Sequence, residues 1–317
     1  MTAGKGAAGG GAAGGGVLWA NAGLLLTSVF WGAVVPVLSN LLGRWDPYLL
    51  SLVRYGIAVP IFWALRWLLE PGPLLPPGIA PVRFVLSGGF IAGFVILYTL
   101  GIARSNPITA AVLSACSPLI AALVEWAGTR APPQRALLFA IPLTVGGAVL
   151  GTVTPEAGVW GFGWGEALVV SGLACWSLYS FTARHWFPGC TPLRLALLTL
   201  TPCGAMLAGA FAAVAAVGLA RPVPALTSRD LWELAWVSLG AVVIAFVLWN
   251  HGVRRLGVAQ ATLYMNLLPF MAMAAAVLYG ILPTTAQVIG CVLVVAGIAQ
   301  SQYFGNRETR LRGRSGG

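Results

Sequence analysis

Residues 96–118, ILYTLGIARSNPITAAVLSACSP, and residues 247–269, VLWNHGVRRLGVAQATLYMNLLP, repeat one pattern. Laid side by side, the two stretches share an aromatic residue, a glycine, an arginine and a proline, each pair 151 positions apart: Tyr98 with Trp249, Gly101 with Gly252, Arg104 with Arg255 and Pro118 with Pro269. Self-similarity at a fixed spacing indicates an internal duplication. The predicted fold must therefore contain two copies of one unit.

A second match extends the duplication toward the N-terminus. Trp31 precedes Pro47 by 16 residues, and Trp176 precedes Pro192 by the same 16 residues, so this part repeats after 145 positions. The difference between the two spacings places about six extra residues near 193–219. The sequence therefore predicts two consecutive copies of one unit.

The composition assigns this duplicated chain to the membrane. Of 317 residues, 58% are hydrophobic and only 8% are charged, and the mean hydropathy is +0.87. A water-soluble domain carries about 25% charged residues. This excludes a soluble enzyme, a nucleic-acid-binding module and a disordered chain. The net charge of +10 fits basic cytoplasmic loops of a membrane protein better than nucleic-acid binding.

Apolar segments long enough to cross a bilayer follow one another along the chain. We predict ten of them, at 18–39, 48–69, 83–103, 108–127, 136–154, 165–187, 193–219, 232–252, 259–281 and 285–304. Five spans in each copy is an odd number, so the second copy must lie upside down in the membrane. The predicted fold is an all-α integral membrane protein with ten transmembrane helices, built as two inverted five-helix repeats.

The distribution of Lys and Arg predicts the orientation. With the N-terminus inside, four arginines lie outside (Arg44, Arg104, Arg221 and Arg229), Arg54 lies within a span, and the other thirteen of the 18 basic residues lie inside. Because basic loops stay in the cytoplasm, we expect both termini there, in a bacterial inner membrane.

Four parts of the chain follow from these spans. We predict a disordered Gly/Ala-rich N-terminus over 1–16, a first repeat over 17–157, a second repeat over 158–304 and a basic cytoplasmic tail over 305–317. The apolar run after residue 16 is too long for a signal-peptide core and is interpreted as the first retained helix.

The order and spacing of several short motifs resemble the drug/metabolite transporter superfamily, in the branch built from two tandem EamA-type domains. The motifs that carry this resemblance are Ser28-Val29-Phe30-Trp31-Gly32, Arg54, the stretch Tyr98 to Pro118, Leu248-Trp249-Asn250-His251-Gly252, Leu256-Gly257, Asn266-Leu267-Leu268-Pro269 and Gln287-Val288-Ile289-Gly290. The resemblance implies a secondary transporter that exports a small organic metabolite, such as an amino acid, by alternating access. Multidrug or nucleotide-sugar transport stays open as an alternative.

Deep or repeat-matched side chains are the candidates for solute binding. Aromatic rings bind apolar solutes without a charge, and a proline within a span frees backbone carbonyls near the midplane. The candidates are Trp31, Arg54, Tyr98, Ser114, Ser117, Pro118, Trp176, Tyr179, Trp249, Asn250, Tyr264, Asn266 and Pro269. The aromatic set favours neutral or aromatic amino acids. Helix packing is the alternative explanation for each residue taken singly.

Two charged residues lie within or near the spans. Arg54 lies about seven residues into the second span, where a charge is costly and marks function. It contacts either an anionic solute or, by extending outward, the helix end. Glu125 lies five residues from Arg130, and we expect a structural pair there rather than proton coupling.

The sequence predicts no enzyme and no cofactor, and a membrane-embedded enzyme is kept as the remote alternative to transport. Its eight acidic residues are dispersed, and it has no G-x-x-x-x-G-K-[ST] loop for ATP. The five cysteines form no CxxC pair and no Cys/His spacing for a metal. The predicted partners are a small-molecule solute and the lipid bilayer, not nucleic acid. Proton coupling, and a monomer or a homodimer, are left open.

Overall fold

The computed structural model is helical throughout the residues that it describes, which are 10–70, 72–76, 78–130, 135–152, 162–222, 225–256 and 264–315. Side chains are described over the same ranges except 10–15, 118, 135–140, 253–254 and 301–315. The helices are α1 Gly10–Leu42, α2 Pro47–Leu69, α3 Pro81–Ile102, α4 Pro107–Ala115, α5 Ser117–Thr129, α6 Arg135–Gly151, α7 Trp164–His185, α8 Pro192–Ala216, α9 Ser228–Ala235, the π-helix η1 Trp236–Ile244, α10 Ala245–Leu256, α12 Leu268–Leu278 and α13 Thr285–Ser315. No strand occurs in these ranges.

Proline and a capping side chain set the start of three of these helices. Asp46 accepts hydrogen bonds from the backbone of Tyr48 (2.8 Å) and Leu49 (3.1 Å) at the start of α2. Asn106 caps α4 and Thr191 caps α8 in the same way. In each case a proline occupies the first turn, where its missing N–H would have no partner. The connections are therefore short and sharply defined.

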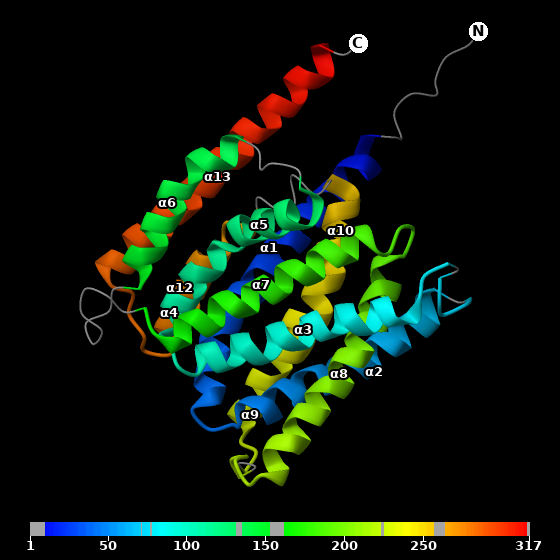
Figure 1. Cartoon of the computed structure of the whole chain (residues 1–317), viewed down its shortest axis with the longest axis vertical. Coiled ribbons are helices and arrows are strands. Elements are labelled where there is room, and N and C mark those ends of the chain that lie inside the picture. Colours follow the sequence, from blue (N-terminus) through cyan, green and yellow to red (C-terminus); the bar gives the residue numbers. More distant parts are fainter. Residues whose placement is uncertain are drawn as a thin grey trace.

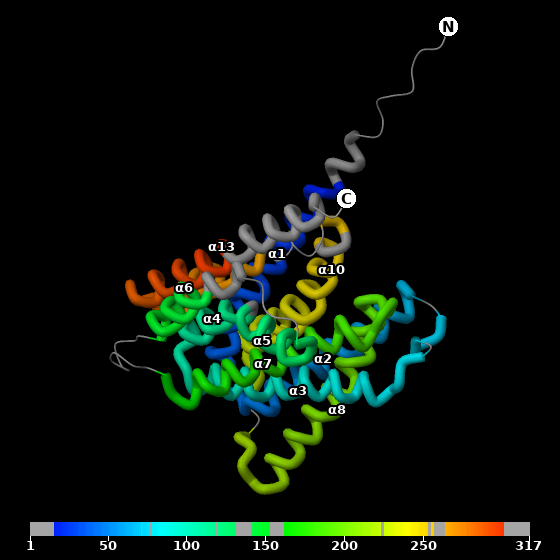
Figure 2. Tube along the Cα trace, turned by 45° about the horizontal axis from the view of Figure 1, so that its top comes forward, coloured from blue at the N-terminus to red at the C-terminus, as the bar shows by residue number. Residues whose placement is uncertain are grey.

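Contacts between a helix of the first repeat and a helix of the second have counterparts between the corresponding helices. α1 corresponds to α7, α2 to α8, α3 to α9–η1–α10, α4–α5 to α12, and α6 to α13. α3 packs on α7 as α10 packs on α1, and α5 packs on α7 as α12 packs on α1. α2 packs on α8 and α6 on α13, each joining corresponding helices (Figures 1 and 2).

Individual close approaches repeat at the spacings found in the sequence. A Cβ placed on Gly101 would lie 2.7 Å from Val169, and one placed on Gly252 would lie 2.5 Å from Leu24. Gly252 is the match of Gly101 at 151 positions, and Val169 is the match of Leu24 at 145 positions. The duplication is therefore present in the packing as well as in the sequence.

The pair of α6 and α13 depends on facing glycines. A Cβ on Gly147 would lie 2.6 Å from the carbonyl oxygen of Gly290, and a Cβ on Gly290 would lie 2.5 Å from that of Gly147. The two helices run in opposite directions along one side of the molecule (Figure 1). Small residues let helices approach closely in a membrane, where van der Waals packing holds them together.

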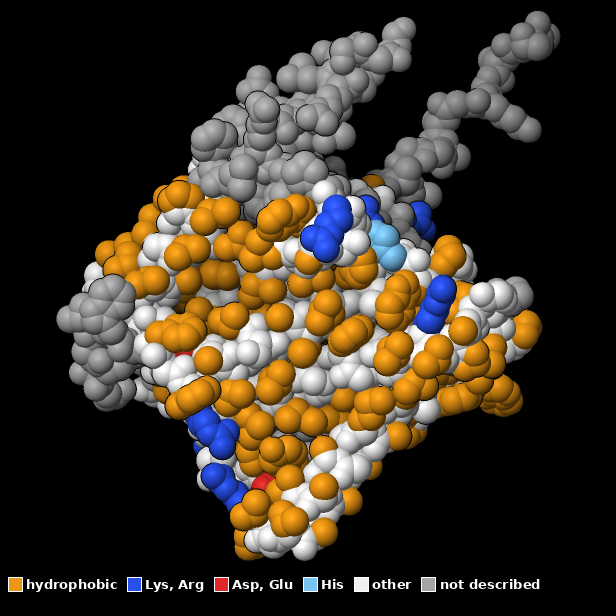
Figure 3. Space-filling model, viewed as in Figure 1, with side chains coloured by type: hydrophobic (Ala, Val, Ile, Leu, Met, Phe, Trp, Pro, Cys, Tyr) orange, Lys and Arg blue, Asp and Glu red, His pale blue; other side chains and the backbone are white. Residues whose placement is uncertain are grey.

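The helices are apolar on their outer side, as a membrane protein requires. Hydrophobic side chains cover most of the face in Figure 3, and the basic side chains lie toward its margins. Within the described residues, five helices are long and apolar enough to cross a bilayer, or six if the bent pair α4–α5 counts as one span. Each of the ten predicted segments overlaps a helix, but the number of spans stays a prediction.

The two ends of the chain extend the predicted helices. α1 begins at Gly10, inside the segment 1–16 that is predicted to be disordered, while 1–9 lies outside the described residues. α13 continues to Ser315, through the predicted tail. The start of α1 and the end of α13 lie at the same end of the molecule (Figure 1).

Candidate functional site

The two matched prolines begin new helices instead of lying within continuous ones. Pro118 lies in the first turn of α5, after a break at Cys116 where α4 and α5 bend by 45°. Pro269 lies in the first turn of α12, after a turn at Asn266 and Leu267. A proline in the first turn of a helix loses no helical hydrogen bond, because an N–H at that position would have no partner within the helix. The side chain of Pro118 lies outside the described residues.

Polar candidates gather at the α4–α5 break. The hydroxyls of Tyr98, from α3, and Ser114, from the last turn of α4, lie 2.7 Å apart. Ser114 also donates to the carbonyl of Ala110, and Ser117 donates to the carbonyl of Ser114. Three predicted residues therefore meet where the helix is interrupted.

Predicted aromatic residues of α7 and α3 form a continuous chain of rings. The centroid of Phe94 lies 5.1 Å from Tyr98 and 5.2 Å from Trp176, and Trp176 lies 5.3 Å from Tyr179. The sequence did not single out Phe94, which joins the others. The chain ends at Tyr98, so it reaches the polar group at the break.

The matching rings, with the two repeats exchanged, also meet. Trp31 of α1 and Trp249 of α10 lie 5.5 Å apart, and the indole N–H of Trp31 donates to the carbonyl of Ala241 at 2.8 Å. Ala241 belongs to the π-helix η1, and π-helical turns are frequent at functional sites. Trp31 matches Trp176 and Trp249 matches Tyr98, so each aromatic set joins a ring of one repeat to a ring of the other.

Three remaining candidates lie near the start of α12 or on α10. The hydroxyl of Tyr264 donates to Asn21 of α1 at 2.7 Å, and Ser28 donates to the carbonyl of Tyr264 at 2.8 Å. Asn250 bonds within its own helix, to Phe246. Asn266 is half-buried in the turn before α12. The structure brings Tyr264 against α1 but does not join Asn250 and Asn266 to the aromatic pair.

Arg54 is buried among the helices, with 7% of its surface exposed. Its guanidinium lies 5.7 Å from the ring of the neighbouring Tyr55, and Tyr98 is within electrostatic range. Its Nε is completely buried without a hydrogen-bond partner. The expectation that this arginine extends outward to the helix end does not fit this burial.

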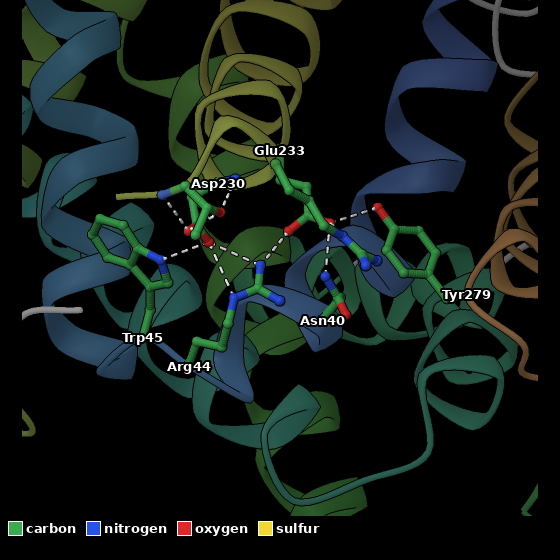
Figure 4. A network of polar contacts seen from close by, with 8 residues as sticks. Asn40, Arg44, Trp45, Asp230, Glu233 and Tyr279 are labelled. Atoms are coloured by element: carbon green, nitrogen blue, oxygen red, sulfur yellow. Dashed lines mark hydrogen bonds and ion pairs between the residues drawn. The ribbon is translucent and has the colours of Figure 1, made fainter. Parts of the chain in front are cut away.

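The sequence missed a network that joins the end of α1 to α9 and α12 (Figure 4). Arg44 contacts Asp230 at 2.8 Å and Glu233 at 2.9 Å, and both acids are almost completely buried. Glu233 also accepts hydrogen bonds from Asn40, Arg229 and Tyr279, and Asp230 accepts one from Trp45. The only signal in the sequence is the charge-rich segment Arg229 to Glu233 at the start of a span.

The opposite end of the bundle is joined more weakly. Glu125 of α5 pairs with His185 of α7 at 3.4 Å, and the two side chains are 38% and 35% exposed. The prediction that Glu125 pairs with Arg130 is wrong, because Glu125 contacts His185 instead and Arg130 ends α5 in a left-handed conformation. Asn40 in the buried network is the match of His185 at 145 positions.

The described residues include no group of three or more His, Cys, Asp or Glu placed to hold a metal ion. Three of the five free cysteines are only partly buried, and the other two are buried in the helix bundle.

Apolar helices, a duplicated arrangement and polar groups at interrupted helices together define a multi-pass membrane transporter. The sequence pattern of the EamA-like transporter family matches residues 16–153 and 163–301, so the chain belongs to this family. The predicted boundary between residues 157 and 158 falls between the two matched segments.

Relatives and a solved structure agree with this membership. Two proteins of Bacillus subtilis (strain 168), described as uncharacterized transporters YyaM and YrdR, are 24% and 22% identical. The first alignment covers 87% of this chain and 90% of YyaM, and the second covers 90% and 91%. A protein of known crystal structure superposes with a TM-score of 0.62 at 22% identity, over 92% of this chain and 98% of its own, which shows the shared fold.

Proposed function

We propose that this transporter exports a small organic metabolite, such as a neutral or aromatic amino acid, across a bacterial inner membrane. The proposal is carried mainly by the aromatic residues, which meet in two sets related by the duplication: Trp31 with Trp249, and Trp176 with Phe94 and Tyr98. Rings placed beside hydroxyls at an interrupted helix suit a solute with an apolar body and a polar end. Tyr264, Asn250, Asn266 and the two prolines belong to the same proposed site.

The architecture that we propose is ten spans in two inverted repeats, with both termini in the cytoplasm. The antiparallel pair of α6 and α13 supports the inversion, because these helices occupy corresponding places in the two halves. The start of α1 and the end of α13 lie at one end of the molecule, which supports an even number of spans.

The proposed mechanism is alternating access, in which one end of the bundle opens while the other stays closed. The network of Arg44, Asp230 and Glu233 lies at the end away from both chain ends, which is the outer end in this orientation (Figure 1). We propose that it holds that end closed and breaks when the solute leaves. The half-exposed pair of Glu125 and His185 opposes opening at the other end much less.

Transport by the purified chain in liposomes tests the function. Vesicles loaded with labelled amino acids, nucleosides, sugars or organic cations should release an amino acid faster than empty-membrane controls. The assay is repeated with and without a pH gradient, because a proton-coupled carrier accelerates when the gradient drives it. Release of none of these compounds would refute the proposal, and release of only cations or nucleotide sugars would favour the other transporter classes.

A further inference from the structure

Arg54 differs from the other arginine buried in the same helix. Arg66 donates to the carbonyls of Gly72 and Pro73 at 3.1 and 3.2 Å, so its charge serves the end of α2. Arg54 lies about 10 Å along the helix from Pro47, at 1.5 Å per residue. None of its nitrogens forms a hydrogen bond or an ion pair with any described residue. Its charge has no structural use comparable to that of Arg66.

The acids of the described region are engaged elsewhere. Asp46 caps α2, Glu70 accepts from Thr191, Glu125 pairs with His185, and Glu166 accepts from Ser105 and the backbone of Gly163. Asp230 and Glu233 belong to the network with Arg44. A buried cation without a counter-charge destabilises the folded protein. Removing one partner of a buried ion pair, which leaves such a lone charge, costs several kcal/mol of stability. The missing negative charge must therefore come from another molecule.

The surroundings of Arg54 indicate what that molecule is. Tyr98, in electrostatic range of the guanidinium, shares its hydroxyl with Ser114 and stands at one end of the aromatic chain. The π-helix η1, which packs against α2, carries two further buried groups without partners, the indole N–H of Trp236 and the hydroxyl of Ser238. The Nε atoms of Arg66 and Arg194 also lack partners, but Arg66 is bonded through its other nitrogens. Buried polar groups nearly always have a partner, so a fully unbonded guanidinium points to a bound polar group.

We infer that Arg54 binds the carboxylate of the transported solute. The planar guanidinium matches a carboxylate with two parallel hydrogen bonds. A single cation balances one negative charge, whereas a phosphate carries more charge and an organic cation is repelled. The inference rests on the proposed transport function and narrows its substrates to organic monoacids with an apolar or aromatic body, amino acids included.

Four compounds with the same phenyl body separate the contributions of the carboxylate and the amino group to binding. Binding of L-phenylalanine, 3-phenylpropionate, L-phenylalanine methyl ester and phenylethylamine is measured by thermal shift of the full chain in detergent and by competition in liposomes. The two acids should bind about 10- to 100-fold more tightly than the ester and the amine, because the latter lack the charged partner of the guanidinium. Arg54→Met should remove this preference, and Arg54→Lys should keep part of it.

Arg104→Met is the matched control, because Arg104 is exposed in the turn after α3 and its side chain, among the described residues, bonds to the carbonyl of Leu100 alone. It should keep the preference for acids. Equal binding of acid and ester by the wild-type chain, or an unchanged preference in Arg54→Met, would overturn the inference while transport stands. If Arg54→Met does not fold, the wild-type comparison and Arg54→Lys decide. Failure of every compound to bind or move would refute the transport proposal as well.

Discussion

Trp31 makes two different contacts with the second half of the chain. Its ring packs on Trp249, and its N–H donates to Ala241 in η1. We expect Trp31→Phe to keep the ring contact and lose the hydrogen bond, which lowers the free energy of unfolding by about 1 kcal/mol. Thermal denaturation in detergent measures the change. Trp19→Phe is the control, because Trp19 is 75% exposed and should tolerate the change.

At the scale of single residues, the sequence predicted the aromatic positions better than the ion pairs. Trp31 and Trp176 were found because the duplication matches them, and the structure places each beside rings of the other half. Arg44 and Asp230 are 186 residues apart, and nothing local to either one indicates the other. Long-range charge pairs depend on the packing of several helices, so they become visible only in the folded chain.

Two neighbouring glycines of α6 test the packing between elements. Gly147→Ala would place a methyl group against the backbone of Gly290 and Val294, so we expect a loss of about 1–3 kcal/mol. Gly146 has no atom within 4 Å of its added Cβ, so Gly146→Ala should be neutral or stabilising by about 0.5–1 kcal/mol. Melting curves of both variants are compared. Equal melting temperatures would contradict the close contact of α6 and α13.

The network at the end of α1 gives a second prediction for the helices. Glu233→Gln removes a charge that Arg44, Arg229, Asn40 and Tyr279 share, and we expect a loss of about 1–3 kcal/mol. Spin labels at Gly43 and Ser228 should show a larger share of long distances in this variant, because α1 and α9 separate more readily.

Glu125→Gln is the matched control, since its partner His185 is half-exposed. Its melting temperature should correspond to a change within about 0.5 kcal/mol, and the label distances should not change. An unchanged distance distribution in Glu233→Gln would show that the network does not hold α1 to α9.

At the scale of the helices, proline and hydropathy predicted most boundaries. Pro118 indicated an interruption, but its effect is stronger than a kink, because a new helix starts there. The π-helix η1 has no signal in its sequence, WVSLGAVVI, which is apolar like its neighbours. The change from α-helical to π-helical hydrogen bonding depends on the helices packed around η1, so the local sequence does not predict it.

For the whole molecule, labelling of the native Cys190 tests the orientation of the chain in the membrane. It is half-buried between α7 and α8, in a loop that we expect inside the cell. In a chain whose other four cysteines are replaced, a membrane-impermeant maleimide should label it in inside-out vesicles and not in intact cells. Burial raises the pKa of the Cys190 thiol, so labelling is done at pH 8 or above, where more thiolate is present.

A cysteine at Ser228, in the same background, is the matched control for the other side. It lies at the exposed start of α9 and should be labelled in intact cells. Labelling of Cys190 in intact cells, with Ser228→Cys protected, would reverse the proposed orientation. The count of basic residues predicts the orientation of the whole chain, but no contact within the bundle depends on it.

The packing of helices from one repeat against helices of the other has a consequence for synthesis of the chain. The most extensive helix pairs, α6 with α13, α3 with α7 and α1 with α10, each join one repeat to the other. In the described part of the chain, neither repeat has a comparably extensive pair of its own. When the ribosome has released only the first repeat, its helices therefore lack their main partners. α3 meets its partner α7 as soon as the second repeat begins, whereas α6 lacks its partner until α13, the last helix, has been made.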